Sequence, residues 1–498
     1  MKSIWGGSRE EQNDGSSDQA SARNSTHTER DSAPPNEHTR LLPNRVEGTN
    51  YLSPDDPAVS PYNLRSIRFT RYLTIFFTFV AFAWWTILLV SIFVTPPGFH
   101  IRGSGFFPFS YASVALANLL FTLIFFAVPA KAVRVASLIV GGLLFLDAIF
   151  LISIEKTRYE EGWVGAFLTV IWTLVTDRLV EWGKYEEEER LTGRAETRRT
   201  LGEWVAVLVS TISMVILAIV VFLMTCTLLL RALDSGLAVP GKLYWVDGAK
   251  YRLHVYCRGN HTGTRVVPTV LIEGGEGPVE NGLWEFADNA VKNGSINRYC
   301  FVDRPGFAWS DTAPSPLSAG MTIEAIDEAL ARAGENGPWV LMSAVDPLHE
   351  EFLSDVGAPG RGFILWLRGI ISPLGLDRVP GAVFKGRTKE DRVWGRAAYQ
   401  TGKYIFARLQ ENLVAGTLSK RDVASSRAIQ DRDVPLTLVS SGAKIRKDSK
   451  WEEKQRDLSG LTHNLHHWDI ANDAPHRVWE TMEGRELIEK RLRQLVHG

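Results

Sequence analysis

Five apolar runs in the first half of the chain limit its possible folds more than any other feature. The runs cover residues 72–94, 110–128, 135–154, 162–176 and 204–230. A helix needs roughly 20 apolar residues to cross a bilayer, and four of the runs are of that order. The run 162–176 is shorter and could also form a buried or re-entrant segment. Several such runs in tandem predict a multi-pass helical membrane domain over residues 69–232.

The segment before these runs is polar, and the chain as a whole is near neutral. Residues 1–68 contain few apolar side chains, so they cannot bury enough surface to offset the entropy of ordering. We expect a disordered tail there, and its acidic residues argue against a mitochondrial transit peptide, which is poor in acids. The formal net charge of -1 argues against a nucleic-acid partner. The expected partner is the lipid bilayer.

Lys and Arg residues near the runs predict which face of the membrane each end occupies. If all five runs span, eleven of these residues lie on the N-terminal side and six on the other. The positive-inside rule then places the N-terminus in the cytoplasm and the C-terminal domain in a lumen or outside the cell. Glycosylation acceptor sequences at Asn260 (NHT) and Asn293 (NGS) agree with that face. An endomembrane or the plasma membrane is therefore favoured.

Residues 240–498 alternate predicted strands with predicted helices, which indicates an α/β domain with a mostly parallel sheet. The segment KLYWVDGAKYRLHVYCRG predicts a β-hairpin, because Asp-Gly between alternating runs is a strong two-residue turn signal. The segment TIEAIDEALARAG predicts a helix that ends at its glycine. The region of about 357–430 is helical, basic and aromatic, and we expect it to form a cap.

Five motifs, in this order, resemble those of the α/β-hydrolase family. They are RLHVYCRG, EGGEG, VDRPGFAWSD, VDPLHE and NDAPHRVWE, of which DRPGFAWSD is the most specific. Together with the apolar runs, they make the chain similar to a fungal group of membrane-anchored α/β-hydrolase-like proteins. Some of that group are labelled mitochondrial integral membrane protein, which keeps a mitochondrial membrane as an alternative location. The resemblance implies hydrolysis of an acyl or ester substrate near a membrane surface.

The segment PWVLMSAVDPLHE lacks the part of the hydrolase fold that carries the nucleophile. In the family, the strand WVLMSA leads into a G-x-S-x-G turn, and a helix and another strand follow. Here a single residue separates Ala344 from Asp346. Ser343 is the only serine at this junction, and no glycine stands beside it to permit a tight turn. We therefore expect a hydrolase-like sheet that is incomplete at its centre, in which Ser343 is not a nucleophile.

Two explanations for the gap stay open. In the first, coding sequence for about two dozen residues, the size of a crossover plus a strand, has been removed as an intron. In the second, the protein has lost catalysis and is a membrane scaffold or interaction protein. Loss of a central strand leaves unpaired backbone groups on its neighbours, each costing roughly 1–3 kcal/mol, which favours the first explanation. Under both, the chain with this sequence is expected to be inactive.

The other catalytic parts of the family have candidates in this sequence. His476 follows the last predicted strand, where the fold places its general base. The acid should follow VPLTLVSSG, and Asp448 and Glu452 are among the nearest carboxylates. The oxyanion loop corresponds to EGGEG, whose glutamates would oppose a developing negative charge if they point toward it. Its glycines are Gly274, Gly275 and Gly277.

Cys257 and Cys300 are a candidate disulfide. In the hydrolase sheet the second hairpin strand lies beside the strand that ends in VDRPG, so the resemblance places the two cysteines on neighbouring strands. Their register is open, and two buried free thiols are the alternative. No metal site is expected, because the adjacent His466 and His467 point to opposite faces of a strand. No cofactor motif is present, and the sequence sets no oligomeric state.

Overall fold

The computed structural model describes residues 65–99, 102–126, 130–154, 163–192, 201–260, 267–343 and 348–497. The tail predicted to be disordered lies almost entirely outside these residues, and so does the junction at residues 344–347.

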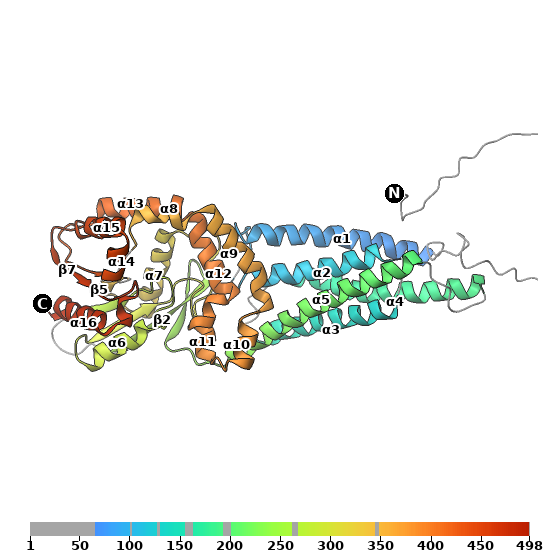
Figure 1. Ribbon diagram of the computed structural model, residues 1–498, viewed down its shortest axis with the longest axis horizontal. Coiled ribbons are helices and arrows are strands. Elements are labelled where there is room, and N and C mark those ends of the chain that lie inside the picture. The colour runs from blue at the N-terminus through green and yellow to red at the C-terminus, as the bar shows by residue number, and fades with distance from the viewer. Residues whose placement is uncertain are drawn as a thin grey trace, which may run out of the picture. The chain divides into compact units, whose positions relative to one another are not determined.

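Five long helices occupy the first half of the chain and pack side by side (Figure 1). They are α1 (Arg65–Ser91), α2 (Phe106–Ile124), α3 (Lys131–Ser153), α4 (Val164–Thr192) and α5 (Leu201–Asp234). Four of them, α1, α2, α3 and α5, are long and apolar enough to cross a membrane. The four longer predicted runs therefore correspond to four such helices.

Helix α4 contains the shortest run and continues into the charged sequence EWGKYEEEER, so it is not among the four. Its apolar half nevertheless packs within the bundle. Trp163, just before α4, contacts Tyr111 near the start of α2, with 6.2 Å between ring centroids. Asp177 accepts hydrogen bonds from Ser137 near the start of α3 (2.5 Å) and Thr122 near the end of α2 (3.4 Å). The apolar half of α4 therefore runs parallel to α2.

The bundle is apolar both inside and outside. Leu144, Met214 and Val221 are fully buried in its core. On the outer faces, Phe79 of α1 is 72% exposed and Ile152 of α3 is 57% exposed. Apolar surface on this scale marks a face that meets a partner or a lipid phase.

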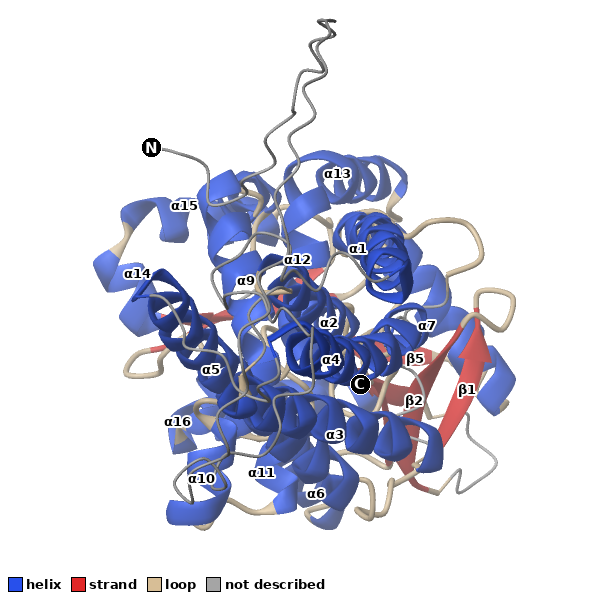
Figure 2. Ribbon diagram, turned by 90° about the vertical axis from the view of Figure 1, so that its right-hand side faces the viewer, coloured by secondary structure: helices blue, strands red, loops and turns tan. Residues whose placement is uncertain are grey.

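The second half of the chain contains a five-stranded mixed sheet (Figure 2). Its strands are β1 (Lys242–Val246), β2 (Tyr251–Gly259), β3 (Thr269–Ile272), β4 (Arg298–Val302) and β5 (Trp339–Met342). The strand order is β1-β2-β4-β3-β5. The pairs β1–β2 and β2–β4 are antiparallel, whereas β3 runs parallel to β4 and β5. The predicted α/β class is thus confirmed as a mixed sheet rather than a mostly parallel one, since two of the four strand pairs in this sheet are antiparallel.

Two local predictions are confirmed by backbone geometry. The β1–β2 hairpin turns through Asp247 and Gly248, whose φ angles of 53° and 64° suit the turn that Asp-Gly favours. Helix α7 (Ala319–Ala333) ends at Gly334, which adopts a left-handed φ of 80°. A glycine accepts this conformation without steric cost, so the helix ends where the sequence indicates.

Helices cover both faces of the sheet. On one face, α6 (Leu283–Lys292) and α16 (Met482–His497) pack with β3 and β4 in one apolar cluster that includes Phe286, Phe301 and Leu492. On the other face, α7 packs on β1 and β2 through residues such as Ala329 and Leu253. This is a three-layer arrangement with the core on either side of the strands.

The last two strands form a separate sheet. β6 (Leu436–Ser441) pairs in parallel with β7 (Leu465–Ala471) and, among the described residues, hydrogen-bonds to no other strand. Val439 and Ala471 nevertheless share the apolar cluster of α6 and α16 with β3 and β4. The two sheets therefore share a core without a strand that joins them.

The strand β5 ends the five-stranded sheet on the side where the chain continues toward β6. Leu341, in the middle of β5, is 71% exposed. Strands of a parallel sheet are ordinarily covered on both faces. The exposed leucine therefore marks a part of the sheet that no helix covers within the described residues.

The region predicted to form a cap is helical. It contains α8 (Leu353–Val356), α9 (Pro359–Ile371), α10 (Arg378–Phe384), α11 (Lys389–Val393), α12 (Gly402–Val414) and α13 (Lys420–Ile429). After β6 come α14 (Gly442–Lys447) and α15 (Ser449–Ser459), and short helical turns lie at 350–352, 372–374, 396–400, 415–419 and 478–480. The cap helices contact the bundle: Phe406 of α12 packs edge-on against Phe106 of α2, with centroids 6.2 Å apart.

Candidate functional site

His476 and the glycine turn line one small cavity. The cavity has a volume of about 30 Å³, and its walls include Gly275, Gly277, Tyr399 and His476. These residues come from a turn after β3, from the cap and from the segment after β7. The fold thus brings the predicted base and the predicted oxyanion loop together, although about 200 positions separate them in the sequence.

The glycine turn is held by cap and loop side chains that bind its carbonyl groups. Arg304 donates a hydrogen bond to the carbonyl of Gly275, and the Tyr404 hydroxyl donates to the carbonyl of Glu276 at 2.6 Å. The Glu276 carboxylate lies 3.6 Å from the Arg408 guanidinium. Arg408 therefore neutralises part of the negative charge that the sequence places at this turn.

Ser343 follows the last residue of β5 and is exposed. Its hydroxyl donates a weak hydrogen bond of 3.4 Å to the Glu273 carboxylate. Ser343 is not among the described residues that line the His476 cavity. A nucleophile needs a base within hydrogen-bonding reach, and the partner that the structure gives to Ser343 is a carboxylate of the glycine turn.

The predicted acids have other partners. Asp448 caps α15 by accepting a hydrogen bond from the Lys450 amide at 3.0 Å, and Glu452 pairs with Arg456 one helical turn later at 3.1 Å. His476 instead has Lys444, whose ammonium nitrogen lies 3.5 Å from Nδ1. An acid that orients a catalytic histidine would contact a ring nitrogen. The contacts described for Asp448 and Glu452 are instead with Lys450 and Arg456.

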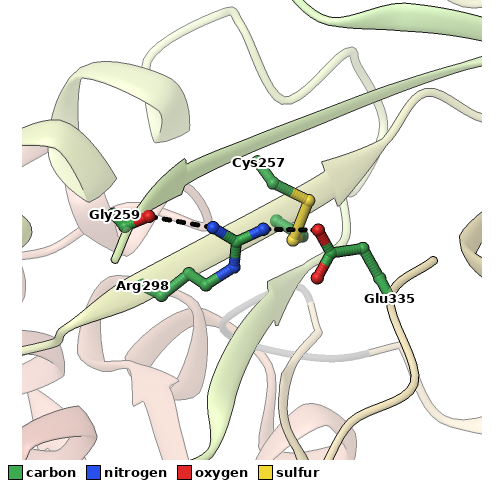
Figure 3. Close-up of a disulfide and its surroundings, with 5 residues drawn as sticks. Cys257, Gly259, Arg298 and Glu335 are labelled. Carbon is green, nitrogen blue, oxygen red and sulfur yellow. Dashed lines mark hydrogen bonds and ion pairs between the residues drawn. A yellow bond between two sulfur atoms is a disulfide. The ribbon is translucent and has the colours of Figure 1, made fainter. Parts of the chain in front are cut away.

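A disulfide joins Cys257 and Cys300 (Figure 3). The two residues are direct partners in the antiparallel register of β2 and β4. Beside the disulfide, Arg298 donates a hydrogen bond to the Gly259 carbonyl at 2.8 Å and forms an ion pair with Glu335. The register that the sequence left open is thus the one that sets the two cysteines side by side.

The second candidate cluster is buried and contains His254, Glu280 and Asp303. One ligand atom from each lies within 4.8 Å of the others, which is a spacing that a metal ion could use. His254, however, has both ring nitrogens in contact with protein: Nδ1 with Asp303 at 2.9 Å and Nε2 with the carbonyl of Pro240. A carbonyl only accepts, so Nε2 carries a proton. Burial and the adjacent charge of Asp303 raise the pKa of Glu280.

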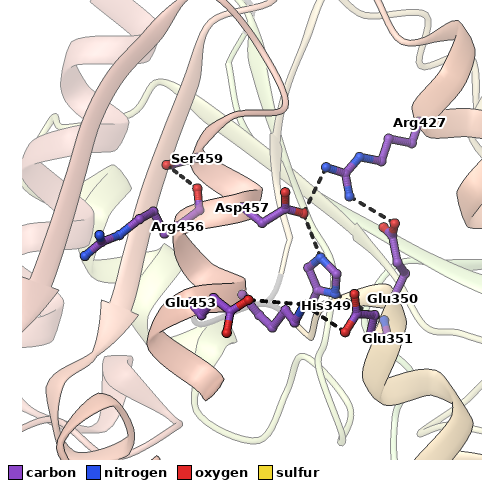
Figure 4. A network of polar contacts seen from close by, with 9 residues as sticks. His349, Glu350, Glu351, Arg427, Glu453, Arg456, Asp457 and Ser459 are labelled. Atoms are coloured by element: carbon purple, nitrogen blue, oxygen red, sulfur yellow. Dashed lines mark hydrogen bonds and ion pairs between the residues drawn. The ribbon is translucent and has the colours of Figure 1, made fainter. Parts of the chain in front are cut away.

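A third polar network begins at His349, in the motif VDPLHE (Figure 4). His349 is buried, and its Nε2 lies 2.8 Å from the Asp457 carboxylate of α15. Arg427 of α13 reaches Asp457 and Glu350, both at 2.9 Å. The hydrogen bond from His349 lowers the pKa of Asp457. The network ties the chain after the junction to α13 and α15, and we assign it a structural role.

Comparison with known proteins finds relatives in two yeasts. An uncharacterized protein of Schizosaccharomyces pombe is 31% identical, and the match covers 82% of this chain and 88% of that protein. The chain belongs to the family of this protein. Residues 37–257 also match a family described as a region of unknown function (DUF2417). An uncharacterized vacuolar membrane protein of Saccharomyces cerevisiae is 25% identical, with 60% of this chain and 59% of that protein covered.

The S. pombe family member is longer in the matched region. The match runs over 471 aligned positions but includes 82% of 498 residues, about 410 residues of this chain. On the order of 60 aligned positions therefore have no counterpart here. The vacuolar membrane name of the S. cerevisiae relative and the four apolar helices of this chain both agree with membrane association.

Three solved structures are similar to about half of the chain. A haloalkane dehalogenase variant from Bradyrhizobium elkanii is 11% identical, with a TM-score of 0.36 and coverage of 51% of this chain and 95% of that chain. An α/β hydrolase from a deep-sea metagenome library has 12% identity and a TM-score of 0.35, and the match covers 50% of this chain and 95% of that chain. A soluble variant of Saccharomyces cerevisiae monoglyceride lipase has 12% identity and a TM-score of 0.34, and the match covers 53% of this chain and 96% of that chain.

Sequence reasoning did not find the buried networks of His254 and His349. Isolated histidines carry no periodic signal, and their partners lie on other elements, from 26 positions away for His254–Glu280 to 108 for His349–Asp457. The basic character of the cap was visible in the sequence, but the contact of Arg408 with Glu276 was not.

Proposed function

We propose that the chain with this sequence is a membrane-anchored α/β-hydrolase-like protein that does not hydrolyse esters. It would descend from acyl or ester hydrolases and act in this form through binding. The observation that carries the proposal is the open side of β5, where the sheet stops among the described strands, together with a sequence that has no G-x-S-x-G motif after this strand.

The strand geometry supports a missing crossover. A parallel neighbour of β5 would require a connection of a dozen or more residues, usually a helix that covers the sheet. Leu341 is exposed on the face where such a helix would pack, and β6 pairs with β7 alone among the described strands. The excess of aligned positions in the S. pombe family member agrees with a segment that this chain lacks.

The side-chain geometry supports the lack of activity. Ser343 contacts Glu273, and His476 contacts Lys444. Ser343 has only this weak contact with a carboxylate among its described partners, in place of the histidine base that activates a nucleophile in the hydrolase fold. A membrane scaffold or interaction protein with a degenerate hydrolase domain would have the same contacts and would also be inactive.

A fluorophosphonate probe, which labels active serine hydrolases, tests this proposal. The full chain in membranes should show no labelling above that of its Ser343→Ala variant. A labelled band that disappears in Ser343→Ala would overturn the proposal. A purified monoglyceride lipase provides the positive control for the probe.

A second candidate function applies to a longer form of the same chain. His476 and the glycine turn still share one cavity, so a form that contains the missing elbow would have a base and an oxyanion loop in place. We propose that such a form is an acyl hydrolase. The genomic sequence between the codons of Ala344 and Val345 decides this: an open frame with a G-x-S-x-G turn supports the enzyme, and a frame without a serine supports the scaffold.

We further propose that the bundle crosses the membrane five times, with α4 as a short span. Its apolar half runs parallel to α2, from Trp163 to Asp177, as the second and fourth of five successive spans would. An odd number of spans puts the N-terminal tail and the α/β part on opposite faces, and the excess of Lys and Arg on the N-terminal side favours a cytoplasmic tail. The vacuolar membrane of the S. cerevisiae relative makes a vacuole-like endomembrane the favoured location.

A further inference from the structure

A second cavity lies between the helical bundle and the cap, apart from the hydrolase-like site. Its volume is about 190 Å³. Its walls come from the start of α2, the C-terminal end of α5, the β1–β2 hairpin and helices α10 to α12. Neither His476 nor Ser343 lines it.

The cavity is strongly cationic. Six cationic side chains line it against two carboxylates, Asp234 and Asp311. The cationic residues are Arg102, Arg231, Arg252, Arg378, Arg392 and Lys403. Asp311 is occupied by Arg252, with 3.0 Å between the charged groups. Arg378 and Arg392 share the other carboxylate.

Asp234, the last residue of α5, is that carboxylate. Arg392 binds both of its oxygens, with contacts of 2.6 to 3.1 Å. Arg378 reaches the same group at 3.5 Å. One carboxylate thus faces two buried guanidinium groups, which are 4% and 7% exposed. A buried charge that lacks a full counter-charge is costly, so this arrangement favours an additional anion.

Two buried polar atoms at the cavity have no hydrogen-bond partner among the described residues. They are Nε of Arg378 and the hydroxyl oxygen of Thr227. Thr227 lies on α5, two turns before Asp234, and is 3% exposed. Burial lowers the pKa of Arg378 to about 10, so the group is still a cation at neutral pH. Buried donors are almost always satisfied in native proteins, and an oxyanion in the cavity would satisfy both.

The position of the cavity indicates where the anion comes from. The ends of two apolar helices, α2 and α5, meet there, which is the depth of the lipid headgroups if those helices span. Next to it, the cap presents apolar side chains to the outside: Phe363 of α9 is 60% exposed and Phe384 of α10 is 84% exposed. Helices with such faces lie on a bilayer surface.

From this combination we propose that the cavity binds the phosphate group of an anionic membrane phospholipid, with Arg378, Arg231 and Thr227 as ligands. The guanidinium groups supply charge-assisted hydrogen bonds to phosphate oxygens. Apolar wall residues such as Phe107 and Trp309 would contact the glycerol and the first part of the acyl chains. Free phosphate offers the same oxyanion, and the experiment separates the two sources.

The test measures thermal unfolding of the full-length protein in detergent while phosphatidic acid, phosphatidylcholine or inorganic phosphate is titrated. Phosphatidic acid should raise the Tm in a saturable manner, because a ligand that binds the folded state stabilises it. Phosphatidylcholine should not. Native mass spectrometry of the same samples should show one retained phosphatidic acid per chain.

Two variants and one control locate the binding. Arg378→Gln should weaken the apparent affinity about tenfold or more, because it removes a charge-assisted contact. Thr227→Val replaces a hydroxyl that has no partner, so it should leave the lipid-free Tm unchanged or higher while still weakening binding. Arg396→Gln, at an exposed site nearby, should behave as the wild type.

Three outcomes would overturn the proposal. Equal stabilisation by inorganic phosphate and phosphatidic acid, with no retained lipid, would assign the site to a soluble phosphate. No stabilisation by either would remove the site. Wild-type lipid binding in both Arg378→Gln and Thr227→Val would place the lipid elsewhere. None of these results bears on the absence of serine-hydrolase activity, so the two proposals fail separately.

Discussion

Cys257 of β2 and Cys300 of β4 are opposite each other in the antiparallel register, and a disulfide joins them. A disulfide between strands persists in an oxidising compartment and is rare in the cytosol. The pair therefore connects the topology of the sheet with the side of the membrane on which the α/β part lies.

We expect peptide mapping under non-reducing conditions to recover Cys257 and Cys300 as one cross-linked peptide. The protein should be taken from membranes with its thiols blocked at lysis. Cys226, which is a free cysteine in α5, should be alkylated in the same sample and is the internal control. Recovery of Cys257 and Cys300 as alkylated thiols would contradict both the disulfide and the lumenal side.

Glycan occupancy gives a separate test of the same side. Asn260 and Asn293 are exposed, but the Asn293 side chain donates a hydrogen bond to Glu489 at 3.1 Å, and the neighbouring Ser295 is buried. We expect Asn260 to be the main acceptor, so an endoglycosidase should shift the wild type and have little effect on Asn260→Gln. Asn24→Gln, in the N-terminal tail that we propose to be cytoplasmic, should behave as the wild type. A protein without any glycan would favour the opposite orientation.

The His349–Asp457 contact should stabilise the region after the junction. Asp457→Ala leaves the buried Nε2 of His349 without its carboxylate, which should cost about 1–2 kcal/mol. In a chain of this size that lowers the Tm by roughly 2–4 °C or less. Arg456→Ala, which removes an exposed pair with Glu452 beside it, should change stability by less than about 0.5 kcal/mol. Equal effects of the two changes would refute the structural role of His349.

Lys403 should make stability depend on pH in the alkaline range. Burial lowers its pKa to about 8, although Asp311, Asp303 and Glu280 partly oppose the shift and Arg231 adds to it. An unfolded lysine titrates near 10.4, so between about pH 8 and 10 the unfolded chain binds more protons than the folded one. Stability contributed at this site therefore rises with pH in that window.

The measurement for Lys403 is the difference in Tm between wild type and Lys403→Met across pH 7.5 to 10. The difference should move in favour of the wild type as the pH rises. Lys385→Met, at an exposed cap position, should show no such trend. A pH-independent difference for Lys403→Met would mean that the lysine titrates as it does in water, and the proposed effect of burial would be wrong.

Local features were predictable where the residues that produce them lie within one short segment. The Asp-Gly hairpin needs two residues with positive φ, and α7 needs a glycine at its end, so both are visible in the sequence. The candidate site was predictable in part, because the order of the motifs indicated that His476 and the glycine turn belong together. The acid was not, since Asp448 and Glu452 use their carboxylates within their own helix.

The sequence by itself determined that four helices of this protein are apolar enough for a bilayer, that strands and helices alternate after them, and that no elbow follows WVLMSA. These are properties of consecutive residues, because hydrophobic length and period act along the chain. Only the tertiary structure decided that Cys257 faces Cys300, that Leu341 is uncovered, and that Arg378 and Arg392 share Asp234. The disulfide and the shared carboxylate depend on register and packing between segments that lie 43 to 158 positions apart. The exposure of Leu341 depends on the lack of a covering helix among the described residues. No pattern of consecutive residues contains this information.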